Sequence, residues 1–256
     1  MRNLCLIVLS SFLFLITACN SKSSEQSQSA GAASQGYTTV EPATAATVRG
    51  TVTFAGKAPA PVEIDMSADP ACQFAGGGPA TSEQYAVNNG KLANVYVYIK
   101  EGLEGKNFAP LQAPAVLDQE GCRYHPHVLG MMVGQPLRIL NSDPATHNVH
   151  PSPKVEGNHE WNISQMPKGD PVEKTFTQPE MMMPVQCNQH NWMKAYINVS
   201  RTPFFAVSDA TGNFEIKGLP PGEYTLAAMH EKAGEQTQKI TVGPSESKQV
   251  QFVFSK

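Results

Sequence analysis

Charged side chains are scarce in this 256-residue chain: Asp, Glu, Lys and Arg make up 16% of it, and the net charge is only −3. Such a chain, with no basic cluster, gives no reason to expect a nucleic-acid partner. Sustained helical periodicity is also absent, because the apolar runs are short and alternate with polar residues. With 20 Gly and 20 Pro to supply turns, the sequence predicts an all-β protein.

Signatures of common enzymes are missing too. No nucleophile is accompanied by a base and an oxyanion-binding pair, and no Gly-rich loop is suited to hold a phosphate. We therefore set aside hydrolase and kinase functions and do not expect an enzyme.

The N-terminus has the features of an export signal. Arg2 is followed by an apolar run over residues 4–16, which is too short for a comfortable membrane span. The sequence I-T-A then precedes Cys19 and resembles a bacterial lipobox, which implies cleavage before Cys19 and acylation of that cysteine. We expect a signal peptide over residues 1–18; an ordinary signal peptide with an incidental cysteine is the alternative.

A polar, low-complexity segment follows over residues 19–45, and its composition predicts a flexible tether. The lipid at Cys19 would anchor the protein to a membrane that faces the periplasm, and we expect the outer membrane rather than the inner one. A location at the cell surface is the alternative.

Three cysteines remain for the exported protein, namely Cys72, Cys122 and Cys187. Cysteines in an oxidising compartment tend to pair. Cys72 and Cys122 both lie in loop-like contexts and are candidates for a disulfide, which leaves Cys187 unpaired. Metal ligation would explain an unpaired exported cysteine, and a buried free thiol is the plain alternative.

Short alternating segments separated by turn signals predict a β-sandwich over residues 46–202. The clearest strand covers residues 93–100, where aromatic and β-branched residues alternate. A long polar loop is expected over residues 151–180. Further strands are expected at residues 47–54, 62–66, 115–118, 129–133, 136–141, 172–176 and 195–199.

A motif typical of metal ligands precedes the last of these strands. Cys187, His190 and Met193 have C-x2-H-x2-M spacing, and His147 lies upstream in the sequence H-N-V. One thiolate, two imidazoles and one thioether are the ligands of a blue copper site, because the sulfur ligands suit Cu(I) and imidazole suits both oxidation states. The sequence therefore predicts one copper ion bound by these four residues.

These residues resemble the cupredoxins, and the ligand loop has amicyanin-like spacing. The resemblance implies a Greek-key β-sandwich, one type 1 copper ion and one-electron transfer. It also implies that Asn148, which follows the first histidine, braces the ligand loop by hydrogen bonds.

Other histidines compete for metal roles. His150 lies three residues after His147, so in a regular strand it faces the opposite side and would replace His147 only at a turn. His125 and His127, with His150 or His159, are candidates for a second metal site, which would suggest a copper enzyme. Solvated loop histidines are the plainer interpretation.

Two apolar features near the motif also have two interpretations. Met181, Met182 and Met183 are either a Cu(I)-binding cluster or apolar packing and partner surface. Trp192, between His190 and Met193, either shields the metal and lies at the electron exit or simply packs.

After residue 202 the sequence pattern changes to short strands separated by tight turns. Asp209 begins a D-x-x-G-x-F sequence and Gly218 begins G-L-P-P-G-x-Y. Both resemble the carboxypeptidase regulatory-like family, which implies a small β-sandwich module without catalytic activity over residues 203–256.

The expected function is one-electron transfer by an exported, membrane-anchored copper protein that meets its redox protein partners in small, transient interfaces. One alternative is a copper-binding or delivery protein that holds Cu(I) without cycling. Another is a structural or interaction protein in which the metal is incidental.

Overall fold

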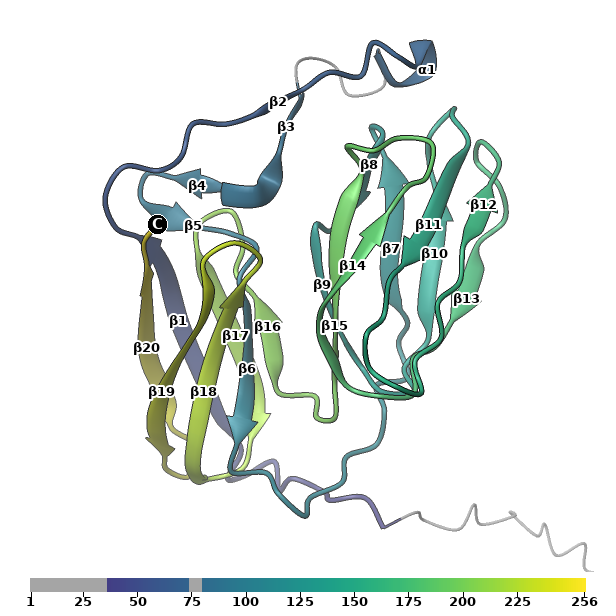
Figure 1. Ribbon diagram of the computed structural model, residues 1–256. Coiled ribbons are helices and arrows are strands. Elements are labelled where there is room, and N and C mark those ends of the chain that lie inside the picture. Colours follow the sequence, from purple (N-terminus) through teal and green to yellow (C-terminus); the bar gives the residue numbers. More distant parts are fainter. Residues whose placement is uncertain (1–35, 74–79) are drawn as a thin grey trace, which may run out of the picture. The chain divides into compact units, whose positions relative to one another are not determined.

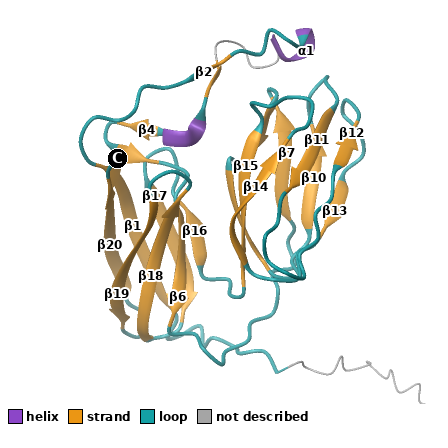
Figure 2. Ribbon diagram, viewed as in Figure 1, coloured by secondary structure: helices purple, strands orange, loops and turns teal. Residues whose placement is uncertain are grey.

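The computed structural model describes residues 36–73 and 80–256, and Gly36–Lys256 form one compact unit. The predicted signal peptide, Cys19 and most of the tether lie outside the described residues. Within these residues the fold is all-β, with 20 strands, one four-residue α-helix and one 3-10 turn (Figures 1 and 2). Neither helical segment of this part has the length and hydropathy to cross a membrane.

One β-sandwich is built from residues 115–200. Alternating burial in its strands places apolar side chains such as Leu117, Ile139 and Ile197 between the two sheets, where they are fully buried. The first sheet has the order β13 (Val172–Lys174), β10 (Leu137–Asn141), β7 (Ala115–Glu120) and β8 (Arg123–His125). The second has the order β12 (Ile163–Gln165), β11 (His147–Pro151), β14 (Glu180–Gln186), β15 (Lys194–Ser200) and β9 (Val128–Met132).

The other sandwich has its own core, to which Val48, Val97 and Leu226 contribute fully buried side chains. In its first sheet, β1 (Ala46–Phe54) lies between β17 (Asn213–Leu219) and β20 (Ser247–Phe254), with β5 (Lys91–Leu92) and β4 (Val87–Asn88) at one end. Its second sheet has the order β16 (Phe205–Val207), β6 (Tyr96–Glu101), β18 (Gly222–His230) and β19 (Gly234–Val242).

The sheets do not follow the expected division at residue 202. The strands at 47–54 and 93–100 were expected in the copper domain, yet β1 pairs with β17 and β20, and β6 pairs with β16 and β18. The residue 115–200 sandwich is therefore inserted between β6 and β16 of the C-terminal module. Alternation identifies a strand but carries no information about its distant partner, which explains the difference.

Between β1 and β4, the described residues carry only short elements. These are β2 (Glu63–Ile64), α1 (Pro70–Gln73), β3 (Ala80–Thr81) and the 3-10 turn Glu83–Tyr85. Met66 and Cys72 of this segment are buried in the same apolar cluster as Leu117 and Ile139, so the segment packs against the inserted sandwich.

Candidate metal centre

A tight loop joins β14 to β15 and carries the C-x2-H-x2-M motif. The backbone N–H of Cys187 donates to the carbonyl of Met193 (3.2 Å), and the N–H of Met193 donates to the carbonyl of His190 (2.9 Å). These two bonds close the loop on itself. Cys187 and His190 are each 3% exposed and Met193 is fully buried, so the loop turns its motif side chains inward.

The strand β11 brings His147 to this loop. His147 is fully buried, and its Nδ1 lies 2.9 Å from Nδ1 of His190. Sγ of Cys187 lies 3.7 Å from the same His190 atom. Donor atoms of all three residues lie within 4.8 Å of one another, a spacing suited to one metal ion. The structure thus brings three of the four predicted ligands together, while their role as ligands stays a prediction.

Each histidine is held by a carboxylate at its far ring nitrogen. Nε2 of His147 donates to Oδ2 of Asp143 (2.9 Å), and Nε2 of His190 donates to Oδ2 of Asp69 (3.0 Å). A carboxylate at one ring nitrogen fixes the tautomer and aims the other nitrogen as a ligand. Both Nδ1 atoms are therefore directed toward the shared centre.

Asn148 contributes through its main chain as well as its side chain. Its N–H donates to Sγ of Cys187 (3.2 Å), and its carbonyl accepts a hydrogen bond from the hydroxyl of Tyr124. Its side-chain amide donates to Asn162 (3.1 Å). The predicted brace thus acts on the sulfur through a backbone donor, which any non-proline residue would supply.

The electrostatics favour a thiolate at Cys187. Burial alone would raise the pKa of this thiol, but hydrogen bonds from His147 and from the backbone N–H groups of Asn148, His190 and Gln189 outweigh it and lower the pKa to about 6. For His147, burial lowers the pKa, and hydrogen bonds to Asp143 and Cys187 outweigh it and raise the pKa to about 9. The lowered pKa of Cys187 and the raised pKa of His147 both favour a thiolate–imidazolium pair in the metal-free protein near neutral pH.

A disulfide joins Cys72 and Cys122 directly beside this centre. Sγ of Cys72 lies 3.7 Å from Nε2 of His190. The indole N–H of Trp192 donates to the carbonyl of Cys122 (3.1 Å), and its ring lies over His190 with centroids 5.0 Å apart. Trp192 is half-buried, and its ring packs against His190 at an interplanar angle of 42°.

The competing histidines lie elsewhere. His150 forms hydrogen bonds with Asn188 (2.9 Å) and Glu160 (2.5 Å). His127 forms a hydrogen bond with Glu231 (2.6 Å). His125 bonds the carbonyl of Glu120. In the described part of the chain, none of these three belongs to a group of side chains spaced to share a metal ion.

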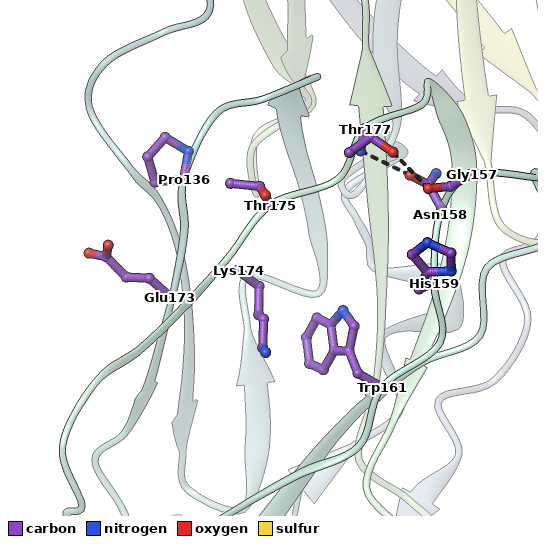
Figure 3. Close-up of a pocket in the computed structure, with 9 residues that line it drawn as sticks. All are labelled: Pro136, Gly157, Asn158, His159, Trp161, Glu173, Lys174, Thr175 and Thr177. Carbon is purple, nitrogen blue, oxygen red and sulfur yellow. Dashed lines mark hydrogen bonds between the residues drawn. The ribbon is translucent and has the colours of Figure 1, made fainter.

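His159 lines a separate hollow of about 420 Å³ together with Trp161 and Lys174 (Figure 3). The amine of Lys174 lies 5.8 Å from the centre of the Trp161 ring. A second metal site at His125, His127, His150 and His159 therefore has no geometric support among the described residues.

The three methionines preceding the motif do not act alike. Met183 is fully buried in the core of the inserted sandwich, whereas Met181 and Met182 are half-buried and pack against Tyr96, Tyr98 and Val128. This is the packing interpretation rather than a sulfur cluster.

Sequence reasoning missed Asp69 and Asp143. Asp143 lies four residues before His147, and that spacing was a usable signal. Asp69 carries no such signal, because it reaches His190 from a segment 121 residues away.

Comparison with known proteins adds a family for the C-terminal module. A family model for the carboxypeptidase regulatory-like domain matches residues 193–255, and this match confirms the predicted kind of module. No curated protein matches the chain.

Several solved structures are similar to part of it. The Cu-containing nitrite reductase (NirK) from Thermus scotoductus SA-01 is 23% identical, with a TM-score of 0.32 over 40% of this chain and 25% of that chain. A Cu(I) structure of an amicyanin mutant is 20% identical, with a TM-score of 0.31 over 41% of this chain and 98% of that chain. A purple cupredoxin from Nitrosopumilus maritimus is 22% identical, with a TM-score of 0.28 over 34% and 99%. The chain thus spans about a quarter of the nitrite reductase.

Proposed function

We propose that this chain is a type 1 copper protein that transfers single electrons between redox partners. The observation that carries the proposal is the convergence of Cys187 Sγ, His147 Nδ1 and His190 Nδ1 in a buried site. The residues fit copper: a soft thiolate and two imidazoles are present, and Met193 is buried on the same loop as the candidate axial ligand.

The residues around the candidate ligands suit a metal ion that changes its oxidation state with little movement of its ligands. Both histidines are held from behind by carboxylates, and Cys187 receives a backbone hydrogen bond from Asn148. Such bracing limits rearrangement when an electron arrives or leaves. Copper supplies the redox chemistry when bound, while the protein residues hold the ligands and exclude water.

Burial favours an electron carrier over an enzyme. The three convergent side chains are at most 3% exposed, which leaves little room for a substrate at the metal. Electrons need no open coordination position, whereas a substrate does. We further propose that the protein is exported and held by a lipid at Cys19 to a membrane facing the periplasm, where transient redox partners reach it.

The test is an optical and electron paramagnetic resonance spectrum of the protein loaded with one equivalent of Cu(II). We expect an intense thiolate-to-copper band in the visible that mild reductants abolish reversibly. The Cys187→Ser and His147→Ala variants should lose the band, and His150→Ala is the matched control that should keep it. A band that survives Cys187→Ser would refute the assignment. A colourless protein that still binds Cu(I) through Cys187 would instead support the delivery function.

A further inference from the structure

The outer edge of His190 is covered by the segment that carries α1. Oδ2 of Asp69 accepts a hydrogen bond from Nε2 of His190 (3.0 Å), and Cys72 Sγ lies 3.7 Å from the same nitrogen. The Trp192 ring packs against the imidazole, with ring centroids 5.0 Å apart. Because of this cover, His190 is only 3% exposed. The side chain of Asp69 is itself 34% exposed, so Asp69 lies between His190 and solvent.

The Asp69 carboxylate is held in place before any metal arrives. Its Oδ1 accepts the N–H of Ala71 (2.8 Å), and its main-chain carbonyl accepts the N–H groups of Cys72 (3.0 Å) and Gln73 (2.9 Å). These bonds fix one carboxylate oxygen in the turn and leave the other for the imidazole.

The same turn is fastened covalently to the turn behind His147. Cys72 is joined to Cys122, and the N–H of Cys122 donates to Asp143 (2.8 Å), the carboxylate that holds His147. The disulfide therefore links the turn that carries Asp69 to the turn that donates to Asp143. These two carboxylates hold the far ring nitrogens of His190 and His147.

We propose that Asp69 is a positioning residue of the metal centre, which fixes His190 with Nδ1 inward and lowers the reduction potential of the bound metal. The inference rests on the proposed function. A carboxylate that accepts the Nε2 proton increases the basicity of Nδ1, and its negative charge stabilises Cu(II) more than Cu(I).

The discriminating variant is Asp69→Asn, with Asp65→Asn as its matched control. Asparagine keeps an oxygen for the Ala71 N–H but has an amide where the Nε2 acceptor was, so the turn is preserved. Asp65 lies in the same segment, is exposed and bonds only locally to Ser67, so its replacement removes an equal charge without touching His190.

We expect Asp69→Asn to weaken Cu(II) binding by roughly tenfold or more, to weaken Cu(I) binding less, and hence to raise the reduction potential. The copper hyperfine splitting in the paramagnetic resonance spectrum should change as well. Asp65→Asn should leave both values near those of the wild type. Equal shifts in the two variants would overturn the inference, because the effect would then be one of net charge alone.

A second measurement needs no copper. Nitrogen-15 spectra of metal-free protein should show the His190 proton on Nε2 in the wild type and a changed tautomer balance in Asp69→Asn. An unchanged balance overturns the positioning role. Should the wild type show no blue copper site, the proposed function fails, and this measurement still decides whether Asp69 orients His190.

Discussion

Removing the carboxylate of Asp143 should destabilise the metal-free protein strongly. Its side chain is 4% exposed and accepts three hydrogen bonds, from Gly121 N–H (2.7 Å), Cys122 N–H (2.8 Å) and His147 Nε2 (2.9 Å). In Asp143→Ala the buried N–H of Cys122 and the buried imidazole lose their acceptor. Each such loss costs about 1–3 kcal/mol, and breaking a buried ion pair costs about 3–5 kcal/mol. We therefore expect the free energy of unfolding to fall by about 3–5 kcal/mol.

The dependence on pH gives this prediction a second signature. The pKa of Asp143 is lowered, because its hydrogen bonds outweigh the burial that would raise it, so its contribution is lost as pH falls through the acidic range. The pKa of His147 is raised from 6.5 to about 9. The stabilisation of the folded state by protonated His147 is therefore complete below pH 6.5 and is lost as pH rises through 9. The difference between wild type and Asp143→Ala should thus be large at pH 6 and smaller at pH 10.

Urea unfolding followed by circular dichroism at both pH values measures the effect. The control is Asp170→Ala, which removes an exposed carboxylate from the same sandwich and should change the free energy of unfolding by less than about 0.5 kcal/mol. A loss under about 1 kcal/mol for Asp143→Ala, or a loss that is the same at pH 6 and pH 10, would refute the reasoning.

Three further predictions concern the metal, the disulfide and the module. At pH 7.5, Cu(II) binding should release about one proton, which comes from His147 with its pKa of about 9. Cys187, with its pKa of about 6, is already a thiolate at this pH and releases none. Titration calorimetry in buffers of different ionisation enthalpy measures the number of protons released, and a release of two protons would contradict the prediction. The double variant Cys72→Ala/Cys122→Ala opens a loop of sequence separation 50 and should lower the free energy of unfolding by about 4 kcal/mol; an unchanged urea midpoint would show that the disulfide does not form. In Gly50→Ala, a Cβ would lie 2.4 Å from the Phe214 ring and 2.6 Å from the carbonyl of Val250, so we expect a loss of about 1–3 kcal/mol. Gly36→Ala is its control, with nothing within 4 Å, and equal stability of the two variants would argue against β1 lying in this sheet.

The loop that carries three of the predicted ligands is the part of the candidate site that a sequence can reveal. Three donors within seven residues must be neighbours once a turn closes, and the bonds between Cys187, His190 and Met193 show such a turn. His147 was identifiable because its type completes the donor set, and because His150 would face the opposite side of the strand. The structure accordingly bonds His150 to Asn188 and Glu160 rather than to the cluster.

The carboxylates that hold the two histidines could not be predicted from the sequence in the same way. Asp69 and His190 are in contact although 121 residues separate them in the sequence. Strands β1 and β20 pair in parallel, and their paired residues Thr47 and Ser247 are 200 residues apart. Both contacts depend on where whole segments lie, while a strand's alternation or an aspartate's identity is a local property. The composition predicted an all-β chain correctly, but which strands share a sheet depended on such distant pairings.

These distant pairings also explain why the two sandwiches are joined as they are. The chain leaves β1 of the C-terminal module, places Asp69 and Cys72 beside His190 of the inserted sandwich, and returns to the module at β5 and β6. A fragment of residues 115–200 alone would keep the predicted ligands His147, Cys187, His190 and Met193, but it would lose the Asp69 carboxylate and leave Cys122 unpaired. The connection between two strands of one module therefore holds a histidine of the other, and this dependence favours keeping both in one chain.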